Sequence, residues 1–489
     1  MRGLYLLRAW ADDPRTFIAS AAVACASSYA LVSVVAAMIQ AAGAGRAPGL
    51  AQAPDLGPVL GATSLTAFAV TVRVHVFVGQ LVARPLSLLV AAGASPSDVK
   101  TLSVLTELAP ASLGALLGSA LASLSVPLVT VVPQAASSGG VGGSSSFQAW
   151  LLGSVVSVAC IAAVVTGTAV LGAARLLASR PPHDSRGHGG DRGETLHGEL
   201  GRWISASLIW ALLVAPVVLV ALAWTPLLAV IEGDGPLAPS PTDELDDLGF
   251  FTAEMRVLAL HATVGLASIV ALTIVMPVMA SRVTRVWTRW VPDGRGPVWW
   301  LAVRQGRHRR AATTAAATSV ALALGFVAFA QSSLDLASMV GVIGPLESRD
   351  GLGQSLSAIA PALVISGGGA FAVAVLTSLR DASEEAGARR HGASSASTGA
   401  VRLALAIIPV VTSLLPVLVC VGVSLGLSLA LGHAIGASVH WAFPRLAPAL
   451  VAGALACAVL VAGDAAGRAA PYLSRAPRAS AAKAATNEE

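Results

Sequence analysis

One segment of the chain joins a helix break to small and charged residues in an order that another protein could recognise. Ser95 is a typical N-cap, and Pro96 fits the first position of a new helix. Asp98 complements the positive end of that helix dipole. We therefore expect a helix end, a turn at Gly93 and a fresh helix start, which form either a docking surface or a plain solvated loop. The segment contains, in order, Arg84, Gly93, Ala94, Ser95, Asp98, Lys100 and Glu107.

Arg73 lies in a long apolar stretch, with His75 close by. An arginine at mid-membrane costs about 2.5–3.5 kcal/mol on insertion scales, so it is expected to face the interior of a helix bundle. Its long side chain can instead extend to the cytoplasmic face of the membrane. The sequence leaves both interpretations open, and the first would make Arg73 an intramembrane functional residue.

The chain lacks the residue sets that catalysis requires. The sequence contains no HExxH motif, no Ser/His/Asp set and no paired intramembrane carboxylates. Lys100 resembles the lysine of a P-loop, but Val99 stands where phosphate binding needs a glycine. His183, His188 and His197 share a glycine-rich charged loop with irregular spacing, so we expect no metal site. We expect no catalytic residue and no directly bound cofactor, and we do not expect an enzyme.

Long apolar blocks position these residues. Of the 489 residues, 55% are hydrophobic and 12% are charged, whereas a soluble protein carries about 25% charged residues. Because roughly 20 apolar residues cross a bilayer as a helix, the pattern predicts an all-α integral membrane protein with about ten transmembrane helices. We place them at 17–42, 59–82, 103–132, 148–177, 203–231, 256–281, 312–336, 355–379, 402–432 and 446–467.

The positions of Arg and Lys predict the orientation of the chain, because such clusters resist translocation. With a cytoplasmic N-terminus, external segments hold only Arg46, Arg256, Arg349 and Arg445. The net charge of +5 then reflects cytoplasmic arginines beside anionic lipid, and we expect membrane lipids but no nucleic acid as partners. The sequence thus predicts a multi-pass protein of the bacterial cytoplasmic membrane with both termini in the cytoplasm. The largest cytoplasmic cluster comprises Arg282, Arg285, Arg289, Arg295, Arg304, Arg307, Arg309 and Arg310.

The charged helix ends also indicate an internal repeat. Arg8 and Arg304 precede the first and seventh helices, and Arg84 and Arg380 end the second and eighth, each pair at an offset of 296 residues. Each half would consist of one helix plus three, in parallel orientation, with a two-helix insert between the halves. The sequence therefore predicts a first half at 1–178, the insert at 179–299 and a second half at 300–489.

The segment around Gly93 resembles the core of the FtsX/MacB-like permease family of ABC transporters. The matching residues are Arg84, Gly93, Ala94, Ser95, Glu107, Gly114 and Gly118. Pro85 stands where the family has an acidic residue, and Ala406 replaces the later Glu of the second copy. We expect the polar stretch that follows Ser394 to be flexible and a poor helix former. The second copy keeps Arg380, Glu384, Gly392, Ala393 and Ser394.

The ten-helix layout is similar to the bacitracin-resistance branch of that family. Members of this branch carry a large external domain after the seventh helix, and here only residues 335–354 are available for one. The resemblance implies a permease subunit whose loops near Gly93 and Gly392, with Asp98 and Lys100, couple to a separate ATP-hydrolysing subunit, expected as a dimer. It leaves a sensor kinase open as a further partner. Substrates would enter from the lipid, and peptide antibiotics or lipid-linked molecules fit best.

Two alternatives remain beside this interpretation. The chain could be an ion-coupled secondary transporter, although proton-coupled carriers usually place acidic residues at mid-membrane and this chain has almost none there. It could also be a membrane scaffold that transports nothing. An adjacent gene for an ATP-binding-cassette ATPase would favour the permease over both.

Overall fold

The computed structural model describes eight long helices and a few separate helical residues. Apart from these helices it describes residues 93–95 and 394, and single residues or short runs within 261–286 and 302–305. The chain is helical almost throughout these parts. The helices are α2 (Pro14–Ala44), α3 (Leu56–Ala91), α4 (Pro96–Leu124), α5 (Gly143–Ala178), α9 (Arg310–Met339), α10 (Glu347–Arg390), α11 (Ser395–Ala434) and α12 (Ala447–Thr486).

Each of the eight helices contains a segment long and apolar enough to cross a membrane. The shortest is Ile359–Ser378 and the longest is Thr398–Ala430. The prediction of an all-α membrane protein is therefore confirmed, and eight predicted helices have a counterpart. The predicted helix at 203–231 lies outside the described residues, and that at 256–281 is described only at separate helical residues such as His261 and Met276.

The helix bounds differ from the sequence prediction by up to about twenty residues, and α4 and α10 differ at both ends. The third predicted helix begins at Pro96 instead of 103, because the short piece after the turn and the apolar span form one continuous helix. Helix α10 continues to Arg390 and α12 to Thr486, well past their apolar spans. Residues 340–346 alone separate α9 from α10, so no large domain fits there.

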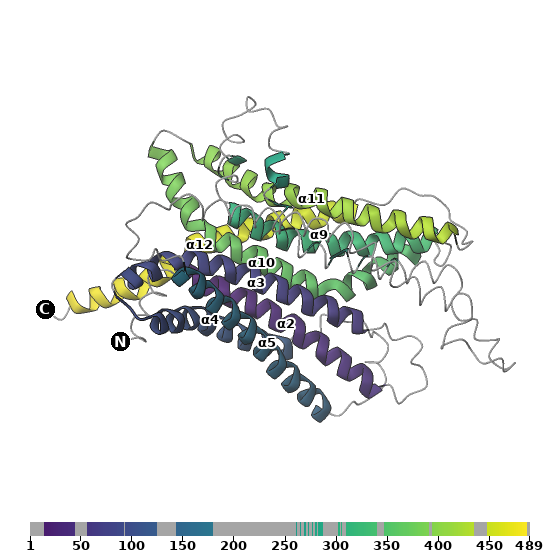
Figure 1. Cartoon of the computed structure of the whole chain (residues 1–489), viewed down its shortest axis with the longest axis horizontal. Coiled ribbons are helices and arrows are strands. Elements are labelled where there is room, and N and C mark those ends of the chain that lie inside the picture. Colours follow the sequence, from purple (N-terminus) through teal and green to yellow (C-terminus); the bar gives the residue numbers. More distant parts are fainter. Residues whose placement is uncertain are drawn as a thin grey trace, which may run out of the picture.

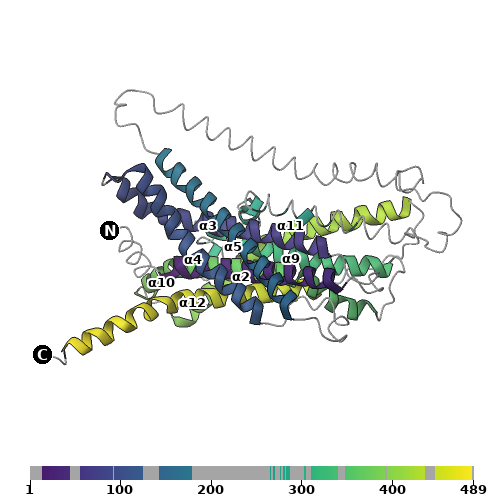
Figure 2. The ribbon, with the colours of Figure 1, turned by 90° about the horizontal axis from the view of Figure 1, so that it is seen from below.

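Helix α10 occupies the centre of the described bundle. It packs on α2 and α3 on one side and on α9 and α12 on the other, as Figure 1 shows. In the turned view of Figure 2, α10 lies beside α12. Small residues permit this close packing, since a side chain on Gly368 would meet Ala26 of α2 and one on Gly369 would meet Val70 of α3. Small residues at helix interfaces are typical of membrane bundles.

Two glycine pairs with a spacing of four residues bring further helices together. Gly114 and Gly118 of α4 lie against the backbone of Ala21 and Cys25 in α2, and a Cβ on either glycine would overlap a carbonyl oxygen. Gly463 and Gly467 of α12 lie in the same way against the backbone of α10. These are GxxxG contacts, in which glycine lets two helix backbones approach closely.

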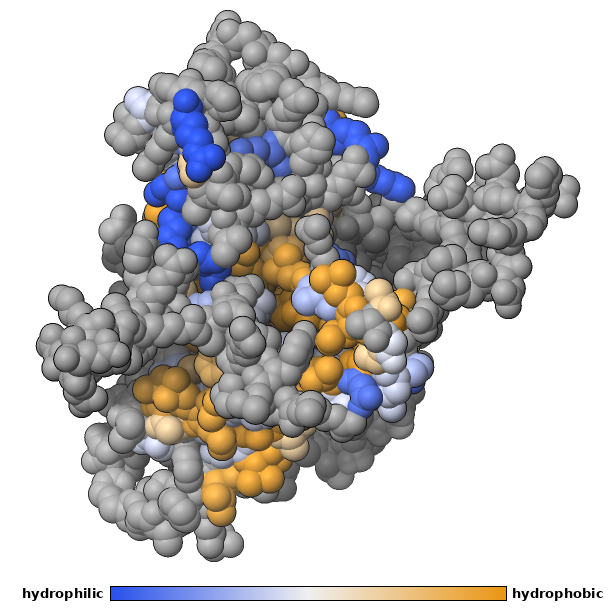
Figure 3. Space-filling view, turned by 90° about the vertical axis from the view of Figure 1, so that its left-hand side faces the viewer, coloured by the Kyte–Doolittle hydropathy of each residue, from blue (hydrophilic) through white to orange (hydrophobic). Residues whose placement is uncertain are grey.

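Several helix ends meet at one end of the bundle. The α3–α4 turn lies there beside the end of α5, because Leu86, Val99 and Leu176 pack together. At the start of α2, Arg15 Nε donates a 2.6 Å hydrogen bond to the carbonyl oxygen of Gly467 in α12. Figure 3 faces the left-hand end of Figure 1, with hydrophilic residues gathered mainly in the upper part of the view.

Candidate functional site

The turn between α3 and α4 has the geometry of a Schellman C-cap. Gly93 has a φ of 89°, its N–H bonds the carbonyl of Val90 at 3.1 Å, and the N–H of Ala94 bonds the carbonyl of Leu89 at 3.0 Å. This left-handed conformation favours glycine, because a Cβ would clash with the chain's own backbone. The predicted turn at Gly93 is confirmed, and its conformation is fixed by backbone hydrogen bonds.

Ser95 caps the helix that follows this turn. Its Oγ accepts a hydrogen bond from the N–H of Asp98 at 3.1 Å and donates one to the Asp98 carboxylate at 2.7 Å. Pro96 is the first residue of α4 and Asp98 lies in its first turn, as predicted. Ser95 and Lys100 are both exposed, and the hydrogen bonds of Ser95 lie at the surface. The segment therefore presents an ordered polar surface. Arg84 lies in α3, and its side chain is outside the described part.

Glu107 lies away from that surface, within the membrane-spanning part of α4. Its side chain is 1% exposed, and its Oε2 is 3.1 Å from His75 Nδ1 of α3, which is 0% exposed. His75 Nε2 is buried and has no hydrogen-bond partner among the described residues. The sequence prediction placed Glu107 in the coupling segment and His75 near Arg73. The structure adds a contact between Glu107 and His75 that was not predicted.

Arg73 is half-buried on the edge of α3. The neighbouring positions Val70 and Val74 are buried, whereas Phe68 is exposed. Helical positions two residues apart are rotated by about 200° around the axis and so point in nearly opposite directions. Arg73 and His75 therefore lie on different sides of α3. The backbone places Arg73 between the two predicted environments, at the boundary of the bundle interior and its outer face.

The second copy of the motif is only partly described. Arg380 and Glu384 belong to α10, but their side chains are outside the described part, as are Gly392 and Ala393. Ser394 is exposed and its carbonyl accepts the N–H of Thr398 at 3.1 Å. The expectation of a flexible stretch after Ser394 is wrong, because α11 already begins at Ser395. The hydrogen bonds of the long helix α11 outweigh the low helix propensity of its first residues.

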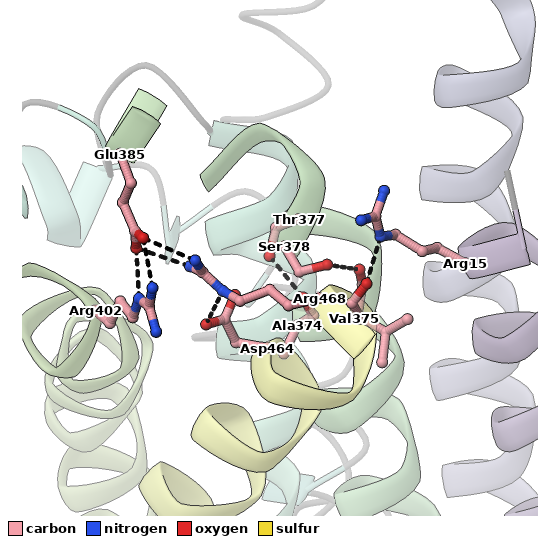
Figure 4. Close-up of polar contacts among 10 residues, drawn as sticks. Arg15, Ala374, Val375, Thr377, Ser378, Glu385, Arg402, Asp464 and Arg468 are labelled. Atoms are coloured by element: carbon pink, nitrogen blue, oxygen red, sulfur yellow. Dashed lines mark hydrogen bonds and ion pairs between the residues drawn. The ribbon is translucent and has the colours of Figure 1, made fainter. Parts of the chain in front are cut away.

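A charge network joins α10, α11 and α12 near the second copy (Figure 4). Both oxygens of Glu385 accept hydrogen bonds from Arg402, and Arg468 binds the same carboxylate at 2.8 and 2.9 Å. Arg468 Nε also donates to Asp464 at 2.8 Å. Burial opposes the ionisation of Glu385, but the hydrogen bonds from the two arginines outweigh it, and its pKa falls from 4.5 to about 2.

A small cavity lies beside this network, between α9, α10, α11 and α12. Its volume is about 90 Å³, and its lining combines polar residues such as Thr377, Arg402 and Asp464 with apolar ones such as Leu405 and Val461. Asp464 Oδ1 is buried and has no hydrogen-bond partner in the part of the chain that the structure describes. The cavity can therefore accept a hydrogen-bond donor at one wall and apolar groups at the others.

His261 forms another buried polar contact, with α9 and α11. Its Nδ1 is 3.1 Å from Ser428 Oγ of α11, and its Nε2 is 3.0 Å from Ser332 Oγ of α9. The ring stacks on Phe329 with centroids 5.0 Å apart. Both ring nitrogens have partners, so this histidine fits a packing role between helices.

The sequence prediction missed most of these contacts for a physical reason. The spacing Asp464-x-x-x-Arg468 is a recognisable helical ion pair and could have been found. Glu385 and Arg402 are 17 residues apart, and His75 and Glu107 are 32 apart, so no sequence spacing signals their contact. Comparison with known proteins finds no matching protein-family model, curated protein or solved structure.

Proposed function

We propose that this chain is the permease subunit of an ABC transporter in the bacterial cytoplasmic membrane, working with a separate ATPase dimer. The observation that carries the proposal is the capped turn at Gly93. It is ordered by its own backbone hydrogen bonds and by packing of Leu86 and Val99, yet it lies at the surface. A preorganised surface loses little entropy when a partner binds it.

The division of roles within the coupling segment follows from burial. Gly93 and Lys100 are exposed and would contact the ATPase together with Ser95. Glu107 is buried behind them on α4 and would respond to a displacement of the turn through its contact with His75. The turn joins α3 directly to α4, so a push on the turn moves one helix relative to the other.

The pattern of helix contacts supports two related halves. In the first set, α4 packs on α2, α5 packs on α3 and α5 packs on α4. In the second set, α11 packs on α9, α12 packs on α10 and α12 packs on α11. Each contact in one set thus has its counterpart in the other, as a repeat of one plus three helices requires. The contact between α3 and α10 would then lie at the axis that relates the halves.

An amphipathic or lipid-linked substrate, such as a peptide antibiotic, fits the surroundings of the cavity beside Asp464. Val461 of the lining is exposed on the outside of α12, as are Leu403 and Leu415 on α11. A molecule arriving through the lipid could place a polar group at the cavity and leave its apolar part against these helices. Only residues 340–346 separate α9 from α10, which leaves no room for a large domain that would block this approach.

An ion-coupled secondary transporter is the second candidate, because one specific observation favours it. The His75–Glu107 pair places two ionisable groups within the candidate spans of α3 and α4. Such residues inside membrane spans often mark proton or ion pathways. The two candidates differ in their energy source, which an experiment can separate.

The test is to purify the tagged chain from its own host and identify the proteins that accompany it. We expect an ATP-binding-cassette ATPase, and we expect Gly93→Val to reduce its recovery. Strain from a side chain at positive φ costs roughly 1–2 kcal/mol, which corresponds to a loss of about five- to thirtyfold if it falls wholly on docking. Gly93→Asn is the matched control, since Asn tolerates this conformation.

Two results would contradict the permease proposal. Recovery without any ATPase, together with transport that follows an imposed proton gradient, would identify the secondary transporter. Equal ATPase recovery with Gly93→Val and with the wild type would instead show that the partner docks elsewhere on the chain.

A further inference from the structure

Two charged side chains keep unused hydrogen-bonding atoms at the cavity between α9, α10, α11 and α12. Asp464 Oδ2 accepts a hydrogen bond from Arg468, whereas the buried Oδ1 has no partner among the described residues. Arg402 uses its Nε and Nη2 for Glu385, so Nη1 and the second hydrogen of Nη2 make no described hydrogen bond. A ligand in this cavity would therefore meet one negatively charged acceptor and several positively charged donors.

The charges around the cavity already balance one another. Glu385 and Asp464 are negative, Arg402 and Arg468 are positive, and ion pairs link all four (Figure 4). Their side chains are between 13% and 35% exposed, so solvent screens an added charge incompletely. A cation alone or an anion alone would leave one excess charge at the site. A zwitterion adds no net charge, and it can bind Asp464 and Arg402 at once.

The cavity lies at the boundary between the apolar core of a membrane and the lipid headgroups. The candidate span of α10, Ile359–Ser378, is 20 residues long, and this length matches a bilayer core of about 30 Å. Thr377 therefore lies at the edge of that core, and it lines the cavity together with Arg402 and Asp464. Headgroups carry charges at this depth, whereas the core does not.

The other walls of the cavity are apolar and reach the outer face of the bundle. Leu405 of α11 and Leu460 of α12 line the cavity, and Val461 lines it while being 43% exposed. The cavity is partly open instead of enclosed. Water would satisfy Asp464 Oδ1, but it gains nothing from the apolar walls. A headgroup with attached acyl chains satisfies the polar atoms and covers the apolar walls as well.

We propose that this cavity binds the headgroup of an aminophospholipid, with the primary ammonium group at Asp464 Oδ1 and the phosphate at the unused N–H groups of Arg402. In phosphatidylethanolamine a short ethylene link joins these two charges, so one headgroup can contact both residues. The hydrogen bonds at both ends are charge-assisted and therefore stronger than neutral ones. The proposal rests on the proposed function in placing a lipid-borne molecule at this cavity, although headgroup binding itself needs no ATPase.

The test compares phosphatidylethanolamine with phosphatidylcholine and phosphatidylglycerol of identical acyl chains. The full chain in detergent receives an equimolar mixture, and mass spectrometry measures the lipid that stays bound after free lipid is removed. Phosphatidylcholine has no N–H on its ammonium group, and phosphatidylglycerol has no ammonium group. We expect phosphatidylethanolamine to be retained roughly tenfold more than either, the value of one charge-assisted hydrogen bond. Equal retention of phosphatidylethanolamine and either other lipid would overturn the proposal.

Asp464→Asn distinguishes the cavity from other lipid contacts. The amide keeps the shape of the side chain but removes its charge, so the preference for phosphatidylethanolamine should be lost. Asp335→Asn is the matched control and should keep the preference, because Asp335 lies 22 residues beyond Thr313 of the cavity lining, about 33 Å along α9. An unchanged preference in Asp464→Asn would place the lipid elsewhere and overturn the proposal.

Should Asp464→Asn fail to fold, N-methylated forms of phosphatidylethanolamine test the same contact in the wild type. Retention should fall as methyl groups replace the N–H donors, and a preference that ignores methylation would overturn the proposal. Soluble phosphoethanolamine tests the headgroup without chains. It should displace little of the bound lipid at equal concentration, because it cannot cover the apolar walls. Complete displacement would show that a soluble zwitterion is the ligand, against the proposal.

Recovery of an ATPase is a separate measurement on the same preparation. Selective retention of phosphatidylethanolamine without an ATPase would support the lipid site and contradict the permease proposal. Recovery of an ATPase with equal retention of all three lipids would support the permease and overturn the lipid site.

Discussion

Glu385 of α10 links this helix to both α11 and α12. Its side chain is 13% exposed and lies between Arg402 and Arg468, each of which donates two hydrogen bonds to it. Bidentate arginine–carboxylate contacts are the strongest of the charge-assisted hydrogen bonds. Removal of the carboxylate would leave two partly buried guanidinium groups facing each other, which is worse than the loss of one ion pair.

Glu385→Gln should therefore destabilise the protein in a way that depends on pH. The pKa of Glu385 is lowered to about 2, so its contribution is complete above the unfolded value of 4.5 and is lost as pH falls from there toward 2. The difference in melting temperature between wild type and Glu385→Gln should be largest near neutral pH and shrink below about pH 4.5. Glu488→Gln in the C-terminal tail is the control. A difference that stays constant down to about pH 3 would contradict this account.

Among the helices, α4 shows most clearly how packing depends on small residues. Gly114 and Gly118 lie one turn apart against the carbonyls of Ala21 and Cys25, which leaves no room for a side chain. Ser28 of α2 adds hydroxyl contacts to Ser119 and Ser157 at 2.8 and 3.0 Å. Close backbone approach and interhelical hydrogen bonds replace the hydrophobic effect, which does not act between helices in lipid.

Gly114→Leu should weaken the bundle, whereas the same change at Gly422 should not. Overpacking typically costs about 1–3 kcal/mol, and here the obstacle is backbone that cannot move aside. Gly422 of α11 is exposed, and no atom lies within 4 Å of the place that a Cβ would occupy. Gly422→Leu is therefore the matched control for the gain in helix propensity. Unfolding in mixed detergent measures both. Equal stability of the two variants would show that α2 and α4 separate easily.

The local elements could be predicted from the sequence, but the contacts between them could not. The turn at Gly93, the cap at Ser95 and the eight described spans follow from glycine, capping residues and apolar length, which act over a few neighbours. The start of α11 at Ser395 was predicted wrongly, because local propensity favours a loop there. The His75–Glu107 pair depends on how α3 and α4 meet, and periodicity alone contains no information on that.

At the scale of the whole molecule, the α3–α4 turn, the end of α10 and the start of α11 lie at the same end of the bundle (Figure 1). The charge network around Glu385 lies at this end too. The N-terminal end of α2 contacts the C-terminal part of α12, and the end of α10 contacts the start of α11. An even number of spans between these ends would bring them to the same side of a membrane, as the arginine distribution also predicts.

A cysteine at Ser97 should therefore be protected from a membrane-impermeant maleimide in intact cells, and one near Arg289 should behave alike. A cysteine at Ser348, at the other end of α10, should be labelled. The four native cysteines would first be replaced by serine or alanine. Labelling of Ser97→Cys from outside, with protection of Ser348→Cys, would reverse the orientation.

The hydrogen bond between Arg15 and Gly467 bears on the order of biogenesis. The two residues are 452 positions apart, so at roughly 5–20 residues per second the ribosome needs about 20–90 s to supply the partner of Arg15. During that time the hydrogen bond from Arg15 Nε to α12 cannot form, and the face of α10 that receives Gly463 and Gly467 stays open to lipid. A chain truncated before α12 would keep both features permanently, which gives membrane proteases and chaperones a means to distinguish unfinished chains from complete ones.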